Sequence, residues 1–491
     1  MTRLLRFWKG WGASTVQTHD NRADKARDIA SSVIMGDTAY VETKTDRIDR
    51  VVAHPVFGIL IFAFVMVLTF TLSQTYVGPF VSDLLMEGFG WLAGLIETLM
   101  VSMDTSDFLT GLVLEGIIGG FAAVIGFLPL IMVLFFLLQL LEDSGYMARV
   151  AIVMDRYFRR IGLAGKSIIP MYVGTACSIP AVMATRTIKN DRQRKLTILL
   201  TPFVPCGAKL PVIALFITVF FAGSGWVTAL TYFLAILVIF LAGMVMRFIL
   251  DVKGHERGIE QFHFIELPDY QRPSLKTALR VMADRGWEFA KKAGTIIILM
   301  NGLVWLTSNF DWSLAAVASP DQSILKSLAS PFAFLLIPLG FGLWGLAAAA
   351  ILGMVAKEEV VGALAVIFAF GVTADFELTS VSETREILMA AGGLTAASAY
   401  AYMAFNLFTP PCFAAIGAMK TELGSRKLTV LAVLFQLVVG YVIAMVIYQV
   451  GTLVFSGTTG DGFLAALVML GLIAVAFVAI KLSRRKVAVH G

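Results

Sequence analysis

Three cysteines lie beside prolines inside apolar segments, where their thiols could bind a metal ion. Cys177 stands in CSIP, Cys206 in VPCGAKLP and Cys412 in TPPC. Sulfur ligands favour soft or borderline cations such as iron(II), copper(I) or zinc over magnesium or calcium. A single membrane cysteine usually packs as a small apolar residue, but all three at proline-marked breaks predict a site for such a cation.

Other polar side chains fall in the same segments. Ionisable groups at membrane depth are costly and usually face a cavity or one another. The lysine and two carboxylates of AKEEVVG could hold that segment together as an ion pair or line an ion path, and both readings stay open. The candidate ion path comprises Ser178, Met183, Lys209, Lys357, Glu358, Glu359, Asn406 and Cys412.

The stretch IGLAGKS, residues 161–167, ends like a phosphate-binding loop. Such a loop needs another glycine five positions before the last glycine and a buried strand in front of it, so that backbone N–H groups surround the phosphates. Arg160 occupies that position, and the preceding residues have helical spacing. We therefore expect no P-loop here and no enzyme, since no histidine lies near a nucleophile at membrane depth.

Composition indicates what must position these residues. The chain has 491 residues, of which 58% are hydrophobic and 15% charged, and its mean hydropathy is +0.82. These values are typical of an integral membrane protein. Stretches without Asp, Glu, Lys or Arg are long enough, or nearly so, to cross a bilayer. They are 56–78, 116–141, 223–246, 293–310, 327–356, 387–419 and 428–460.

The basic residues predict the orientation, because cytoplasmic loops carry an excess of Lys and Arg. Six polar stretches hold 35 of the 39 basic residues: 1–55, 142–167, 186–195, 247–292, 420–427 and 481–486. The polar stretches between them hold only Lys326 and Arg385. Both termini are then cytoplasmic, and the protein is a multi-pass protein of the cytoplasmic membrane.

This orientation requires two re-entrant hairpins. Residues 168–185 would begin and end inside, and residues 331–371 would begin and end outside. Each hairpin is followed by a helix broken by prolines, in 196–222 and 387–419. The predicted fold is therefore all-α, with inverted repeats that each contain a re-entrant hairpin and a broken helix, an architecture typical of transporters.

Several motifs in order resemble the ferrous iron transport protein B family, FeoB. They include GTACSIPAVMATRTIKNDRQRKLTILLTPFVPCGAKLPVIALF (174–216), GMVAKEEVVGALAVIF and NLFTPPCFAAIGAMKTELGS. Ala176 departs from the glycine usual in the first motif. The resemblance implies a permease for Fe²⁺ with Cys177 and Cys206 as its metal-associated residues. It also implies two gate repeats of the kind that nucleoside carriers share.

The resemblance divides the chain into six parts. They are a cytoplasmic N-terminal segment (1–55), a first transmembrane helix with an external amphipathic segment (56–107), a first gate repeat (108–250), a cytoplasmic connector (251–292), a second gate repeat (293–427), and C-terminal transmembrane helices with a basic tail (428–491). Family members normally begin with a GTP-binding domain, and only about fifty-five residues precede the first crossing here.

The implied partners are the lipid bilayer, Fe²⁺ as transported substrate, a separate GTP-binding protein and a small cytoplasmic accessory protein. No cofactor and no nucleic acid are expected, and a homo-oligomer is left open. Two rival functions are transport of another divalent metal and transport of a nucleoside. A nucleoside could be gripped by Asn406, Tyr400, Tyr402 and Glu359, although the cysteines argue against it. A scaffold without transport is a third alternative.

Overall fold

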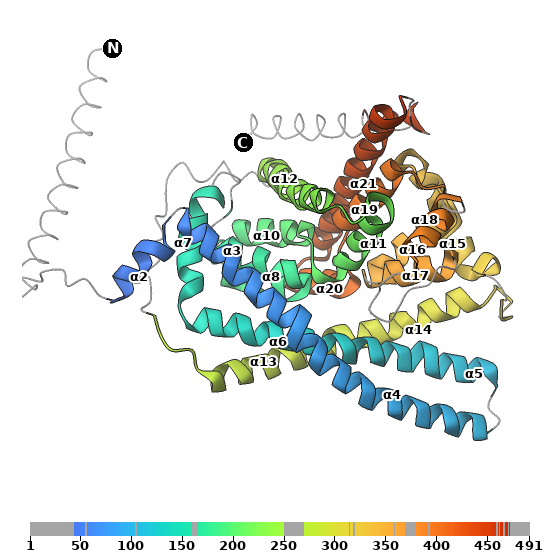
Figure 1. Ribbon diagram of the computed structural model, residues 1–491, viewed down its shortest axis with the longest axis horizontal. Helices are drawn as coiled ribbons and strands as arrows, with labels where there is room; N and C mark the ends of the chain where they lie inside the picture. The colour runs from blue at the N-terminus through green and yellow to red at the C-terminus, as the bar shows by residue number, and fades with distance from the viewer. Residues whose placement is uncertain are drawn as a thin grey trace, which may run out of the picture. The chain divides into compact units, whose positions relative to one another are not determined.

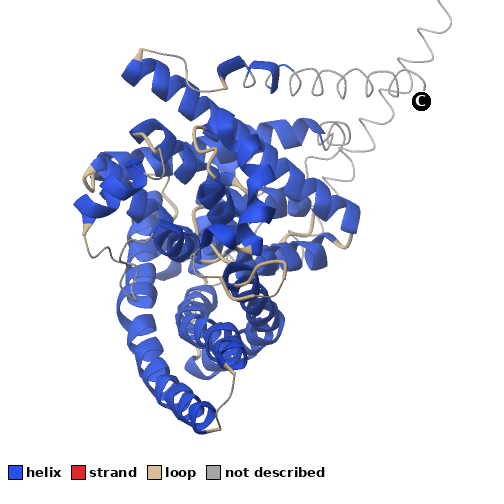
Figure 2. Ribbon diagram, turned by 90° about the vertical axis from the view of Figure 1, so that its right-hand side faces the viewer, coloured by secondary structure: helices blue, strands red, loops and turns tan. Residues whose placement is uncertain are grey.

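The chain is helical throughout the part that the structure describes. This computed structural model describes residues 44–249 and 270–471, except 55, 104–105, 159–162, 164, 314, 318–319, 358, 369–379, 391–392, 458–459, 461, 465–466 and 470. Within these residues the one β pairing is an isolated bridge between Phe310 and Ala316, and Figure 2 shows helices and loops without a strand. The predicted all-α class is confirmed. Helix α2 (Lys44–Val52) belongs to an N-terminal unit that ends at Val51, and the other helices form a second unit.

Five helical stretches in the described residues are long and apolar enough to cross a membrane. They are Phe57–Ser102, Phe108–Asp143, Asp191–Phe221, Gly225–Met246 and Arg426–Phe455. A sixth is obtained if Ile324–Leu339 and Trp344–Val355, which are bent by 102°, count as one span. This confirms a multi-pass membrane protein.

The first two of these stretches form a pair of long helices (Figure 1). One contains α3 (Phe57–Phe70), η1 (Thr71–Val77) and α4 (Gly78–Ser102), and the other α5 (Asp107–Gly111), η2 (Leu112–Ile118) and α6 (Gly119–Asp143). Ser82 Oγ on α4 donates to the Gly126 carbonyl on α6 over 2.7 Å. The expected external segment is thus helical as far as Ser102, because Pro79 lies in the first turn of α4, where a helix tolerates proline.

The first gate region contains a helical hairpin and a broken helix. Its elements are α7 (Tyr146–Phe158), η4 (Gly165–Ser167), α8 (Ile168–Ala176), α9 (Ser178–Ala184), η5 (Thr185–Thr187), α10 (Asp191–Leu200), η6 (Thr201–Phe203), η7 (Gly207–Lys209), α11 (Leu210–Phe221) and α12 (Gly225–Ile249). Helices α8 and α9 pack against each other. Neither is long enough to cross a bilayer alone.

The second gate region also contains a helical hairpin followed by a broken helix. They are α13 (Leu275–Phe289), η8 (Ala290–Gly294), α14 (Thr295–Asn309), η9 (Pro320–Gln322), α15 (Ile324–Leu336), η10 (Ile337–Leu339), α16 (Trp344–Val355), α17 (Glu359–Phe368), α18 (Val381–Ala390), α19 (Ala396–Phe408), α20 (Phe413–Leu423) and α21 (Arg426–Ser456). Helices α16 and α17 pack as a hairpin, and α19 packs along α21.

The two hairpins turn in the same way. The turn residue is extended in both, with φ −152° and ψ 134° at Cys177 and φ −145° and ψ 130° at Ala356. Three residues before each turn is a glycine, where a side chain would crowd a neighbouring segment: Thr201 of the broken helix at Gly174, and Val360 of the returning helix at Gly353. This likeness agrees with two related repeats, while their inverted orientation stays a prediction.

The GKS sequence is part of the packing of the first hairpin. The backbone N–H of Gly165 donates to Asp155 Oδ1 over 2.8 Å. Ser167 is fully buried, and its hydroxyl accepts from Thr197 Oγ1 over 2.8 Å. These hydrogen bonds hold η4 against α7 and α10.

Candidate functional site

Two helices lose their regular hydrogen bonding near prolines, and both breaks carry a cysteine. Between η6 and η7 the backbone is extended, with φ −96° and ψ 166° at Cys206. Between α19 and α20 it is extended from Thr409 to Cys412, across Pro410 and Pro411. A proline has no N–H, so the carbonyl four residues before it loses its helical partner. Each break therefore exposes backbone oxygens within the protein.

The first hairpin and the first broken helix meet at their breaks. A Cβ atom placed on Gly207 would lie 3.3 Å from the Ala176 carbonyl oxygen, so the neighbours of Cys206 and Cys177 are in contact. Both cysteines are buried, each with 8% of its surface exposed. Cys412 is half-buried, and none of the three forms a disulfide. The two proposed metal ligands thus lie on adjoining segments.

Two buried lysines form hydrogen bonds with residues beside these helix breaks. Lys209 Nζ donates to the carbonyls of Pro202 (2.8 Å) and Leu407 (2.6 Å). Lys357 Nζ donates to Thr409 Oγ1 over 3.2 Å. Both lysines line one small gap between α11 and α19.

The other residues of the predicted ion path are divided among different environments. Ser178 and Asn406 are buried, and Ser178 Oγ and Asn406 Oδ1 have no hydrogen-bond partner. Met183 lines a cavity, which is described below. Glu359 is exposed at the start of α17, and Glu358 lies outside the described residues. Asn406 therefore lines the same gap as Lys209 and Lys357, and Glu359 does not.

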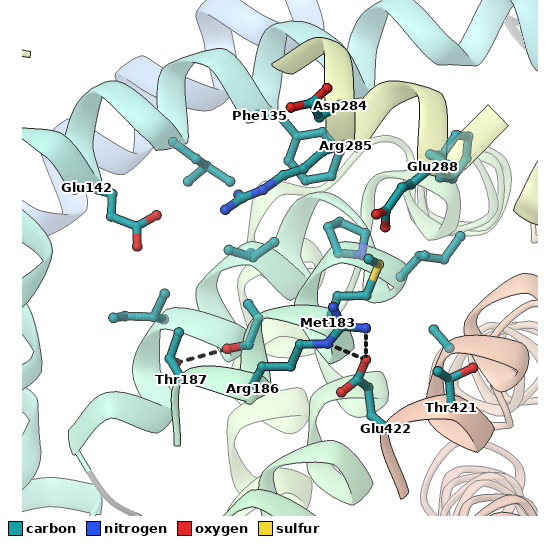
Figure 3. A pocket seen from close by; sticks show the side chains of 18 of the residues that line it. Phe135, Glu142, Met183, Arg186, Thr187, Asp284, Arg285, Glu288, Thr421 and Glu422 are labelled. Carbon is teal, nitrogen blue, oxygen red and sulfur yellow. Dashed lines mark hydrogen bonds and ion pairs between the residues drawn. The ribbon is translucent and has the colours of Figure 1, made fainter. Parts of the chain in front are cut away.

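A cavity of about 570 Å³ opens beside the hairpin (Figure 3). It extends along α9 from Ile179 and along α20 from Ala414, and these residues lie two positions after Cys177 and Cys412. Phe135 of α6 and Phe289 of α13 line the opposite wall. Four carboxylates and two guanidinium groups line it as well, those of Glu142, Asp284, Glu288, Glu422, Arg186 and Arg285, so that acidic groups are in excess. Such a cavity can admit water and a hydrated cation close to the breaks.

An ion pair joins the two gate regions at the rim of this cavity. Arg186 Nε donates to Glu422 Oε1 over 2.7 Å, and Arg186 Nη2 lies 2.6 Å from the same oxygen. The Glu422 side chain is 6% exposed and that of Arg186 is 54% exposed. The hydrogen bond to Glu422 raises the pKa of Arg186 above its usual value, so this partner stays charged. The pair fixes the end of the first hairpin to the end of α20.

The cysteines do not form a complete metal cage. Among the described residues no group of three or more His, Cys, Asp and Glu side chains could hold an ion. A cation at Cys177 and Cys206 would need oxygen ligands from backbone, hydroxyl or water. Incomplete coordination suits a transported ion, which must bind and then leave.

Sequence reasoning missed the cavity and its ion pair. The sequence places Arg186 in a basic stretch that indicates the cytoplasmic side and offers a plausible docking site for a GTP-binding partner, and it predicts no role for Glu422. In that stretch, Asp191 also pairs with Arg194 and Lys195. The position of Arg186 directly after a hairpin was the one available signal, because its partner is 236 residues away.

We predict that the Arg186 and Glu422 side chains are energetically coupled. A double-mutant cycle of Arg186→Gln and Glu422→Gln, measured by thermal unfolding in detergent, should give a coupling of about 1 kcal/mol, modest because Arg186 is half in solvent. The exposed pair Asp191→Asn and Lys195→Gln should give less than ~0.5 kcal/mol. Equal couplings in the two cycles would contradict a fixed contact between the gate regions.

Two family models match the chain. One, described as "Nucleoside recognition" (Gate), matches residues 124–220 and 290–426. The other, described as "Ferrous iron transport protein B C terminus", matches residues 228–285. The first contains both hairpins and both broken helices. No solved structure is significantly similar to the chain.

Curated relatives carry the same family name. The chain is 38% identical over 412 residues to an Fe(2+) transporter FeoB of Staphylococcus aureus, which covers 83% of this chain and 59% of the relative. It is 34% identical over 443 residues to one of Methanocaldococcus jannaschii, with coverages of 88% and 62%. A fusion of Fe(2+) transport protein A with FeoB from Porphyromonas gingivalis is 33% identical, with coverages of 84% and 52%. The chain spans little more than half the length of these relatives, and it belongs to the FeoB family.

Proposed function

We propose that the chain forms the membrane pathway of an Fe²⁺ uptake permease in the cytoplasmic membrane. The observation that carries the proposal is the contact between the Cys177 and Cys206 segments at two helix breaks, next to a cavity lined by carboxylates. Thiolates suit Fe²⁺ better than they suit harder cations. The relatives' printed function, Fe²⁺ transport, supports the same substrate.

In this proposal the cavity is the cytoplasmic vestibule. Its carboxylates attract a cation released from the cysteines, and the thioether of Met183 lines the route. The Arg186–Glu422 pair holds the vestibule rim in the arrangement seen here. Movement of α9 relative to α20 would open the breaks, so the two gate regions would alternate as repeats do in other transporters.

The membrane potential is sufficient to drive import. A potential of about 100 mV, negative inside, contributes roughly 4.6 kcal/mol for a divalent cation. We therefore assign gating to a GTP-binding partner at the cytoplasmic face, on the family resemblance. The P. gingivalis relative, which is named as a fusion with Fe²⁺ transport protein A, supports a small accessory protein as a further partner.

The nucleoside alternative is less well supported, although the matching family model is described as nucleoside recognition. Tyr402 is fully buried and donates to the Leu346 carbonyl over 3.1 Å. Tyr400 lies 3.3 Å from the Thr231 hydroxyl. Neither lines the large cavity, so the residues suited to grip a base serve packing between helices. Another divalent metal remains the second candidate substrate.

We predict that the cysteines are required for uptake. Proteoliposomes with an inside-negative potential should import radiolabelled Fe²⁺ anaerobically, and Cys177→Ser with Cys206→Ser should reduce uptake to background because the soft ligands are lost. Thr98→Ala is the control, since Thr98 is exposed on α4 and bonds only within its own helix. Full uptake by the double variant would rule out the cysteines as ligands. Faster uptake of Mn²⁺ or Zn²⁺ would assign another substrate.

We also predict that the vestibule opens to the cytoplasm. In inside-out vesicles, a membrane-impermeant maleimide should label Met183→Cys, which lines the cavity. Ala181→Cys is the matched control on the same helix, because Ala181 is fully buried. Wild-type protein gives the background of the native cysteines. Labelling of Met183→Cys in right-side-out vesicles alone, where the reagent reaches only the external face of the membrane, would contradict the proposed orientation.

A further inference from the structure

The ammonium group of Lys209 lies between the C-terminal ends of two half-helices. One acceptor, the Pro202 carbonyl, follows α10 in the first gate region. The other, the Leu407 carbonyl, is in the last turn of α19 in the second gate region. Only 2% of the lysine's surface is exposed. A single positive charge thus connects the two broken helices.

The chemistry of the breaks explains why these oxygens are available. In a continuous helix the Leu407 carbonyl would accept from the N–H of residue 411, but Pro411 has none. Pro202 precedes the extended segment at Val204–Cys206, where helical bonding stops. Helix C-termini also carry partial negative charge. The position between the two carbonyls, which the Lys209 ammonium group occupies, therefore favours a cation.

Transporters with broken helices bind a coupling cation with this type of oxygen, supplied by unwound backbone and by half-helix C-termini. Here the oxygens that bond the lysines are neutral: two carbonyls at Lys209 and the Thr409 hydroxyl at Lys357. Asn406 Oδ1, at the same gap, has no hydrogen-bond partner. The set resembles the oxygen ligands of a Na⁺ ion more than the partners of an ion pair.

We propose that Lys209 is a tethered cation that takes the place of a coupling Na⁺ ion at the crossing of the two broken helices. Lys357, which donates to Thr409 Oγ1, lines the same gap. Together the two lysines occupy these oxygens, so that small inorganic cations do not bind them. The transported metal then binds at the cysteines. Where the proposed Fe²⁺ transport holds, that transport needs no Na⁺.

The test replaces the charge but keeps hydrogen-bond donors. Lys209→Gln should import little Fe²⁺ in choline chloride and approximately tenfold more in ~100 mM NaCl, as expected when Na⁺ exceeds its Kd in the vacated site about tenfold. Wild-type uptake should be the same in both salts, and the uptake rate of Lys209→Arg, whether or not it is lower than that of the wild type, should not change with Na⁺. Lys420→Gln, an exposed lysine on α20, is the control for a general effect of charge.

A second measurement does not depend on transport or on the identity of the substrate. NaCl should raise the thermal unfolding temperature of Lys209→Gln relative to choline chloride and leave that of the wild type unchanged, because Na⁺ binds only the vacated site. Equal behaviour of Lys209→Gln in both salts would overturn the proposal, as would Na⁺-dependent uptake by the wild type. Failure to recover the variant in either salt would also overturn it. A wild type that imports no Fe²⁺, with the stability result intact, would refute only the iron assignment.

Discussion

Backbone groups that lose their hydrogen bonds inside a membrane protein must find other partners, and this constraint determines the arrangement of the site. Water is not available in the hydrocarbon region, so non-helical backbone there must be covered by protein or face a cavity. Prolines interrupt α10–α11 and α19–α20, and the hairpins turn at Cys177 and Ala356. Lys209 supplies partners for two of the carbonyls near these interruptions, those of Pro202 and Leu407. Each break therefore costs free energy, and the cysteines and buried lysines lie at these breaks.

The geometry connects the breaks to the cavity rim through two short rigid helices. Helix α9 leads from Cys177 towards Arg186, and α20 leads from Cys412 to Glu422. The two helices pack together, one from each gate region, and the Arg186–Glu422 pair joins their far ends. A change at the rim would therefore reach the cysteines without bending either helix. This coupling is of the kind that an alternating-access transporter requires.

The sequence predicted the parts of the fold that depend on local chemistry. Prolines located the broken helices. That IGLAGKS forms no phosphate loop, inferred from Arg160 in place of the first glycine, stays a prediction. Contacts between distant residues could not be predicted. Lys209 meets the Leu407 carbonyl 198 residues away, and Arg186 meets Glu422 236 residues away.

The most direct test of the account is X-ray absorption at the iron edge on purified protein loaded anaerobically with Fe²⁺. The account predicts sulfur neighbours at about 2.3 Å, a distance typical of metal–thiolate bonds, and their loss in Cys177→Ser together with Cys206→Ser. A shell of oxygen or nitrogen alone, unchanged by the double substitution, would contradict the claim that the cysteines at the helix breaks receive the metal.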